Sequence, residues 1–174
     1  MGIRYMNKYF MQKCKKESIQ KIHLSALSNK MIVIDTSIYL YKYAGQCALQ
    51  ENFFSMITLF HKYNVTPIFV FDGKPPPEKK DEMMRRKIIK QSAEDKYNNI
   101  LLEYETVENE RERVTLLSQM DNLRHQFVRI SDKDNKSVKN MMDAFGVCYY
   151  DANGEADKLC AVISKQENCF GCLS

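Results

Sequence analysis

The sequence has no apolar run long enough to cross a membrane, and its first ten residues, MGIRYMNKYF, contain no hydrophobic secretory segment. Met1 and Gly2 match the start of a myristoylation signal, but Met6 stands where that signal requires Ser or Thr. These absences argue against a secreted, membrane-spanning or myristoylated protein. We therefore expect an intracellular protein without a membrane partner, in the nucleus or the cytoplasm.

Cysteine is present, with six residues, but no cysteine pattern for a metal or redox site is complete. Cys169 and Cys172 form a CxxC pair, and neither a second pair nor a His-x-x-x-His spacing accompanies it. Without a signal peptide we expect the thiols to be reduced. We interpret the pair as small residues of a final strand.

The chain length of 174 residues suits a single domain with a real hydrophobic core, and 44% hydrophobic with 28% charged residues is typical of a soluble globular protein. The net charge of +4 is small but unevenly distributed, because positions 74–90 hold seven Lys and Arg residues against three Asp and Glu. Such a cluster can form a phosphate-binding patch. On its own it is more often a solvated helix face.

Two short apolar runs, 31–35 (MIVID) and 66–72 (TPIFVFD), are typical of strands buried on both faces. Between them, apolar residues recur with a helical period at Phe53, Phe54, Ile57 and Phe60. A strand, a helix and a strand at this spacing predict a βαβ unit with parallel strands. With a third strand at 147–151 and a fourth after position 168, we predict an α/β fold with a mostly parallel central sheet.

The polar stretch 92–124 contains no Gly or Pro, and we expect it to form one or two helices that project from the core. A weak apolar stripe predicts that these helices pack on each other: Ile100, Leu101, Tyr104, Val107, Val114 and Leu117. An amphipathic helix follows in 134–147, ended by Gly146. A last helix is expected at about 155–165, with Asn153 as its cap.

Three of the predicted strands end in an acidic residue: Asp35, Asp72 and Asp151. Glu155 and Asp157 lie in the first helical turn after the third of these strands. Because ligands bind at the carboxyl edge of parallel sheets, we expect these acids to converge there. Oxygen-only ligands suit hard cations such as Mg²⁺ or Mn²⁺, and two such ions commonly cleave phosphodiesters. Taken singly, each acid can also be explained as a helix cap or a partner of the helix dipole.

Four blocks of the sequence resemble the flap endonuclease (xeroderma pigmentosum G-like) family of structure-specific 5′ nucleases: the opening MGI, VIDTSIYLYKY at 33–43, VFDGKPP at 70–76 and GVCYYDANGEAD at 146–157. The resemblance runs along the whole chain. It implies a single N-terminal nuclease domain, 1–174, with a PIN-like core and a helical arch at about 78–130. It also implies Mg²⁺ or Mn²⁺ as cofactor, two ions in the family, and DNA with a 5′ flap or a single-strand/double-strand junction as partner.

The resemblance also implies roles for ten residues. Those expected to bind the first metal are Asp35, Asp72, Glu155 and Asp157, the last standing where the family has Glu. Lys79 and Arg86 would face the scissile phosphate, and their spacing of two helical turns places them on one side of a helix. The residues expected to contact nucleic acid are Gly2, Tyr41, Lys90 and Arg129.

Two features of the family pattern are missing. The connection between Tyr43 and Glu51 is shorter than the segment that helps family members to open duplex DNA. The Glu-Asp-x-Asp segment of the second metal site, and the duplex-binding module after it, would follow Ser174. We therefore expect only the first metal site to be largely encoded here, with a second chain or a C-terminal half to complete it. A non-catalytic nucleic-acid-binding module lacking the second metal site, and a PIN-like nuclease acting on RNA, stay open.

Overall fold

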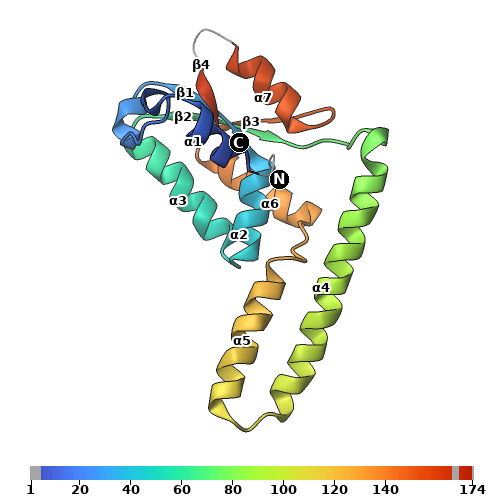
Figure 1. Cartoon of the computed structure of the whole chain (residues 1–174). Coiled ribbons are helices and arrows are strands. Elements are labelled where there is room, and N and C mark those ends of the chain that lie inside the picture. Colours follow the sequence, from blue (N-terminus) through green and yellow to red (C-terminus); the bar gives the residue numbers. More distant parts are fainter. Residues whose placement is uncertain (1–4, 166–168, 174) are drawn as a thin grey trace.

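A computed structural model describes residues 5–165 and 169–173 and contains one parallel sheet (Figure 1). The strand order is β3–β2–β1–β4, with β1 at Met31–Asp35, β2 at Thr66–Phe71, β3 at Cys148–Asp151 and β4 at Cys169–Leu173. The βαβ prediction is confirmed. Asp72 itself lies just beyond the end of β2.

Helices cover both faces of the sheet. Helices α2 (Thr36–Gly45), α3 (Leu49–Lys62) and α6 (Asp132–Ala144) pack on one face, and α7 (Ala156–Ser164) packs on the other. A short helix α1 (Met6–Lys13) and two 3₁₀ turns, Lys16–Ser18 and Leu24–Leu27, precede β1. Because both faces of the central strands are covered, β1 and β2 are almost continuously apolar.

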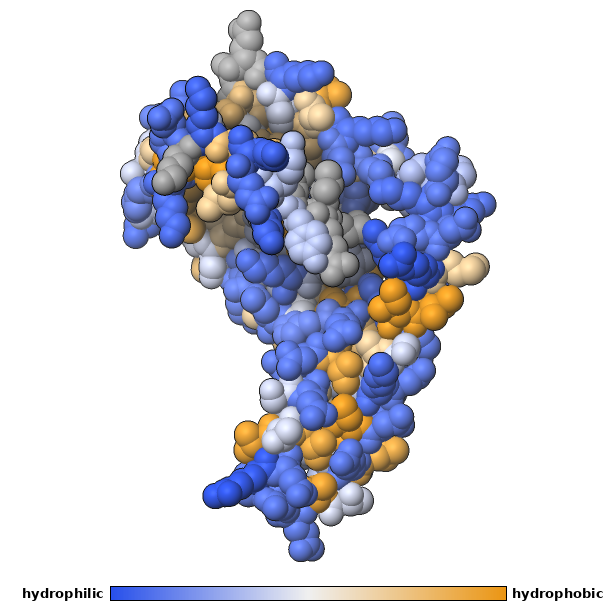
Figure 2. All heavy atoms as spheres, viewed as in Figure 1, coloured by the Kyte–Doolittle hydropathy of each residue, from blue (hydrophilic) through white to orange (hydrophobic). Residues whose placement is uncertain are grey.

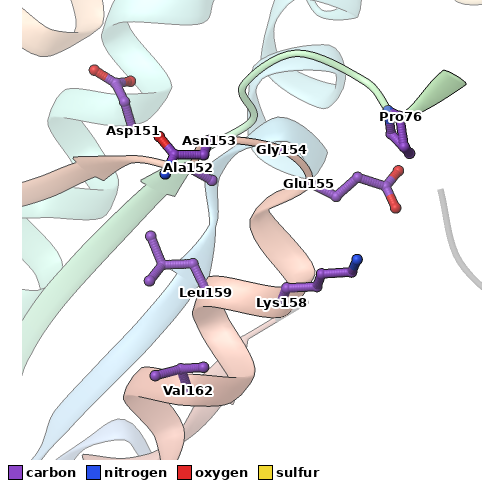
Figure 3. Close-up of a pocket in the computed structure, with 9 residues that line it drawn as sticks. All are labelled: Pro76, Asp151, Ala152, Asn153, Gly154, Glu155, Lys158, Leu159 and Val162. Carbon is purple, nitrogen blue, oxygen red and sulfur yellow. The ribbon is translucent and has the colours of Figure 1, made fainter.

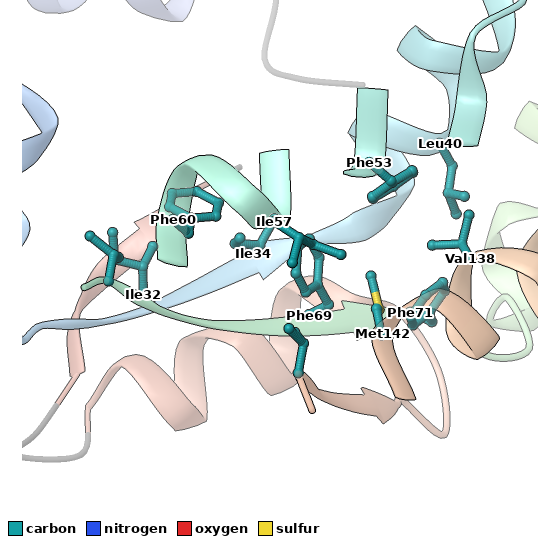
Figure 4. Close-up of a cluster of buried hydrophobic side chains, with 12 residues drawn as sticks. Ile32, Ile34, Leu40, Phe53, Ile57, Phe60, Phe69, Phe71, Val138 and Met142 are labelled. Atoms are coloured by element: carbon teal, nitrogen blue, oxygen red, sulfur yellow. The ribbon is translucent and has the colours of Figure 1, made fainter. Parts of the chain in front are cut away.

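The larger core lies between the sheet and the helices α2, α3 and α6 (Figure 4). Phe53, Ile57 and Phe60 of α3 are buried there, as the helical period predicts. The inclusion of Phe54 in that stripe was wrong, because Phe54 is 50% exposed. One residue along a helix is a rotation of about 100°, so Phe54 leaves the core face and its ring instead meets Phe145, at 5.6 Å between centroids.

Helices α4 (Lys80–Thr106) and α5 (Glu110–Arg124) form a hairpin that projects away from the sheet (Figure 1). The two helices pack on each other, as predicted. The predicted stripe is wrong at Val114 and Leu117, which are exposed, since Leu116 and Met120 supply the buried side of α5. Apolar side chains also remain on the hairpin surface, where Figure 2 shows apolar patches between polar ones.

Helix α6 begins with a capping box. The Asp134 N–H donates to the Ser131 hydroxyl (3.2 Å), and the Ser131 N–H donates to Asp134 Oδ2 (2.8 Å). The helix ends just before Gly146, whose φ of 64° lies in the left-handed region, as the sequence predicts.

Replacing Ser131 by Ala is expected to lower the free energy of unfolding by about 1 kcal/mol, because the first turn of α6 loses a cap. Urea denaturation measures the change. Ser118→Ala, on the exposed surface of α5, is the matched control and is expected to cost nothing. Equal stability of the two variants would contradict the capping role.

Cys169 and Cys172 both lie in β4 with free thiols, which confirms their interpretation as strand residues. Within the described residues, no helix is both long and apolar enough to span a membrane.

Candidate functional site

Two carboxylates are held together at the carboxyl ends of β1 and β2. Asp35 is the last residue of β1, and Asp72 follows β2 directly. Ser37, in the first turn of α2, links them: its backbone N–H donates to Asp35 Oδ1 (3.0 Å) and its hydroxyl donates to Asp72 Oδ2 (2.5 Å). The structure therefore brings together the two aspartates that the sequence predicts at adjoining strand ends.

Asp157 of α7 joins this pair. Burial raises the pKa of Asp35, and the negative charges of Asp72 and Asp157 raise it further, while the hydrogen bond from the Ser37 N–H opposes the shift. The charges of these two carboxylates thus act on Asp35 at the sheet edge. A cation among the three carboxylates would offset the repulsion between their negative charges. The set therefore fits a hard divalent cation in charge and in donor chemistry.

Glu155, the fourth predicted metal ligand, forms an ion pair with Lys79. Lys79 ends the 3₁₀ turn Pro77–Lys79 that precedes α4, so Lys79 and Arg86 do not share one continuous helix as their spacing suggested. Within residues 5–165 and 169–173, no three His, Cys, Asp or Glu side chains have the arrangement of a formed metal site. The acidic side chains lie in the same region, but they do not surround a single point as the ligands of a bound metal do.

Asp151 does not join the acid cluster, so the predicted convergence is wrong for this residue. It pairs in register with Phe71, whose side chain faces the α6 layer. Side chains of paired residues in parallel strands point to the same face, and Asp151 accordingly binds Lys139 of α6 (2.6 Å). Figure 3 shows Asp151 and Glu155 pointing to different sides of the loop between β3 and α7.

The loop after β2 presses against the loop after β3. The Gly73 N–H donates to the carbonyl of Gly154 (2.7 Å), and a Cβ at Gly73 would lie 1.9 Å from the carbonyl oxygen of Ala152. A shallow hollow of about 320 Å³ lies beside this junction, lined in part by Pro76 and Glu155 (Figure 3). The close approach of the two loops fixes Asp72 against the start of α7.

The predicted capping of α7 by Asn153 is wrong. The N-cap position is Glu155, whose own side chain makes no capping bond. The first N–H of the helix, from Ala156, instead donates to Asp72 Oδ1 (2.7 Å). A carboxylate 84 positions away therefore caps α7 and ties the helix to the end of β2.

A second cluster, which we call the arch-base cluster, contains Tyr41, Arg86, Lys90 and Arg129. The Lys90 ammonium lies 4.8 Å from the centre of the Tyr41 ring and donates to the carbonyl of Val128 (2.7 Å). Burial lowers the pKa of Lys90, and the charges of Arg129 and Arg86 lower it further. The structure thus brings together four residues that lie far apart in the sequence, in α2, in α4 and in the segment after α5.

Acidic neighbours partly neutralise the arch-base cluster. Arg86 binds Glu82 one turn earlier in α4 (2.8 Å), and Arg129 binds Glu94 (2.5 Å). Because the side chains of these pairs are partly exposed, each pair contributes only about 0–1 kcal/mol. Gly2, the remaining predicted contact, lies outside the described residues.

Residues 1–93 match a protein-family model described as the XPG N-terminal domain. This chain belongs to that family. The resemblance to the flap endonuclease (xeroderma pigmentosum G-like) family is thereby confirmed. Flap endonuclease 1 of Candida glabrata is 25% identical over 190 residues, which cover 100% of this XPG-family chain and 46% of that protein.

A second relative is the probable RAD2-like endonuclease 369L of Invertebrate iridescent virus 6, 24% identical over 218 residues that cover 100% of the XPG-family chain and 52% of the viral protein. The chain therefore spans about half the length of these curated relatives.

Solved structures show the same fold. The catalytic core of Rad2 superposes with a TM-score of 0.64 at 19% identity, covering 100% of the XPG-family chain and 42% of Rad2. Human GEN1, in complex with Holliday junction DNA, gives a TM-score of 0.56 at 18% identity, with 99% and 36% covered. The predicted fold class is confirmed: a parallel sheet with flanking helices and a projecting helical hairpin.

Replacing Asp35 by Asn is expected to raise the melting temperature of the metal-free XPG-family chain at pH 7. A carboxyl whose pKa is raised in the folded state costs stability once it ionises, so the gain exists above the folded-state pKa and disappears below the unfolded value. Thermal unfolding with a chelator, at neutral and acidic pH, measures it. Asp95→Asn, at an exposed site on α4, should show no such gain. A lower melting temperature for Asp35→Asn at pH 7 contradicts this electrostatic assignment.

Proposed function

We propose that this chain carries the catalytic face of a metal-dependent, structure-specific 5′ nuclease that cleaves DNA phosphodiesters near single-strand/double-strand junctions. The observation that carries the proposal is the gathering of Asp35, Asp72 and Asp157 at the carboxyl edge of the sheet. The relatives support the nuclease part of the proposal, since one is named a flap endonuclease and another is the catalytic core of Rad2 in complex with a DNA substrate.

The proposed metal ligands are Asp35, Asp72, Glu155 and Asp157. A bound Mg²⁺ or Mn²⁺ would supply an activated water and neutralise charge on the phosphate. Asp35 uses Oδ1 to accept from Ser37, and Asp72 accepts one hydrogen bond at each oxygen, so lone pairs remain on both carboxylates for a cation. Lys79 pairs with Oε1 of Glu155, so the other oxygen of this carboxylate is also available to a cation.

Lys79 and Arg86 are the proposed cations at the scissile phosphate. The ion pair between Lys79 and Glu155 puts the Lys79 ammonium beside the proposed metal ligands. The ammonium would then lie beside both the metal ligands and the scissile phosphate. A positive charge placed there before reaction stabilises the charge that develops in the transition state.

The proposed DNA contacts are Tyr41, Lys90 and Arg129 of the arch-base cluster, with Gly2. Helix α2 begins at the acid cluster and carries Tyr41 in its second turn, so a base on the Tyr41 ring would lie near the reacting phosphate. The solved Rad2 structures include a complex with DNA substrate, TM-score 0.62, which supports a DNA partner.

Replacing Tyr41 by Ala is expected to weaken binding of a single-stranded 5′ flap by about tenfold, because a stacked base is lost. Tyr41→Phe keeps the ring and should bind almost as wild type. Fluorescence anisotropy with labelled flap DNA and a chelator measures the affinity. Tyr150→Ala, at another exposed tyrosine on β3, is the control. Equal losses for Tyr41→Ala and Tyr150→Ala would contradict a specific stacking role.

Cleavage of a 5′-labelled flap DNA by the purified chain, with Mg²⁺, with Mn²⁺ and with a chelator, tests the proposal. Cation-dependent products at the junction support it. Flap DNA that is bound and never cut, even when a chain carrying the remaining length of a relative is added, contradicts it. A parallel RNA flap separates DNA from RNA specificity.

The second candidate is a non-catalytic nucleic-acid-binding module. The absence of a formed three-ligand metal site within residues 5–165 and 169–173 favours it. Its signature is flap binding through Tyr41 and Lys90 that is insensitive to divalent cations and to substitution of Asp72. The binding and cleavage measurements above separate the two candidates.

A further inference from the structure

We propose that Ser37 is a positioning residue of the candidate metal site, whose hydroxyl orients the Asp72 carboxylate toward Asp35 and so sets the affinity for the divalent cation. This inference rests on the proposed function, because it concerns two of the same carboxylates. In this role Ser37 would act on the cation through Asp72, to which its hydroxyl donates.

Ser37 makes two different bonds to two strand ends. Its backbone N–H donates to Asp35 Oδ1 (3.0 Å), which is an ordinary helix-capping bond that any non-proline residue at position 37 can form. Its hydroxyl donates to Asp72 Oδ2 (2.5 Å). Only the second bond requires serine or another residue with a hydroxyl, so the side chain at this position has a purpose beyond starting α2.

The direction of the Ser37 hydroxyl supports this purpose. Serine in the first turn of a helix often bonds to nearby backbone groups. Here the hydroxyl bonds to Asp72, 35 positions away and just beyond the end of the neighbouring strand β2. The half-buried side chain therefore bridges two elements.

Asp72 needs this second donor to keep its orientation. Its Oδ1 accepts from the Ala156 N–H of α7 (2.7 Å), which fixes one oxygen. The other oxygen accepts from Ser37, which also bonds Asp35, so this oxygen lies on the side of Asp35, where two like charges would repel each other. Without the Ser37 hydroxyl, rotation of the carboxylate away from Asp35 would relieve that repulsion and separate two proposed ligands. The hydroxyl opposes this rotation.

A neutral donor suits this position better than a cation. Lys79 shows the alternative, because its positive charge offsets the negative charge with which Glu155 would attract a metal. The Ser37 hydroxyl orients Asp72 and leaves its negative charge available. Groups that orient metal ligands through hydrogen bonds commonly contribute 10–100-fold to affinity for the metal.

Titration of the full chain with Mn²⁺, with free Mn²⁺ followed by electron paramagnetic resonance, tests the role independently of cleavage. Ser37→Ala is expected to bind Mn²⁺ about tenfold more weakly than wild type. Ser37→Thr keeps the hydroxyl and should restore most of the affinity. Ser37→Cys nearly keeps the volume but donates weakly, so it should resemble Ser37→Ala. The metal-free melting temperature of each variant verifies that it is folded.

The outcomes separate this inference from the proposed function. If Ser37→Ala and Ser37→Cys bind Mn²⁺ as wild type does while Asp72→Asn does not, the positioning role is wrong and the metal site stands. If Ser37→Thr is as weak as Ser37→Ala, the hydroxyl is not responsible and the role is again wrong. If wild type binds no Mn²⁺, or no more than Asp72→Asn, the metal site itself is wrong and the inference falls with it.

Discussion

Replacing Asp72 by Asn is expected to lower cation-dependent flap cleavage by at least about a hundredfold, roughly 2.7 kcal/mol in the activation barrier, while the fold is retained. The asparagine carbonyl can still accept from the Ala156 N–H, and its amide can donate to the Ser37 hydroxyl, so both bonds of Asp72 have replacements. The negative charge that would hold the cation is lost. Activity is therefore expected to fall because the negative charge is lost, and not because α7 loses its hydrogen bond to residue 72.

The matched control is Asp151→Asn. Asp151 is also an acid at the carboxyl end of a neighbouring strand, but Lys139 holds it on the α6 face of the sheet. It should lose the ion pair and keep cleavage near the wild-type rate. Rates on 5′-flap DNA at saturating Mn²⁺, with melting temperatures for both variants, make the comparison. Full activity of Asp72→Asn, or an equal loss for Asp151→Asn, contradicts the proposed site.

This contrast between Asp72 and Asp151 shows how far the sequence could predict the site. Apolar runs identified β1 and β2 to within one residue, because strands buried on both faces leave a strong pattern. The same pattern does not state which face each final residue takes. That depends on register: Asp35 pairs with Val70, on the α7 face, whereas Asp151 pairs with Phe71, on the α6 face.

Contacts between segments far apart in the chain could not be predicted from the sequence, for a different reason. The Lys79–Glu155 pair and the Asp72 cap on Ala156 join residues 76 and 84 positions apart, and no local spacing encodes such pairs. Local capping rules therefore chose Asn153 for α7, although the real acceptor comes from another loop. One feature of the sequence could have pointed to Ser37: its hydroxyl lies two positions after Asp35, the aspartate that ends β1. Its partner could not be known without the sheet.

The close approach of the two loops at Gly73 leads to the largest expected loss of stability. A Cβ at this position would lie 1.9 Å from the Ala152 carbonyl oxygen and 2.9 Å from its carbonyl carbon, and both are backbone atoms that cannot rotate away. Gly73→Ala must therefore push the loop after β2 away from the loop after β3. We expect the free energy of unfolding to fall by about 3 kcal/mol, at the upper end of the usual cost of overpacking.

The displacement also disturbs the proposed metal site, because Asp72 is the residue before Gly73 and accepts the hydrogen bond of Ala156 at the start of α7. Moving the loop separates Asp72 from both of its donors, so cleavage should fall together with stability. Gly154→Ala is the matched control, since its Cβ would meet nothing closer than the Lys74 carbonyl oxygen at 3.9 Å. Urea denaturation of the two variants, with Mn²⁺ titration of each, provides the measurement. If Gly73→Ala is as stable as Gly154→Ala, the two loops do not press together, and the capping of α7 by Asp72 loses its structural basis.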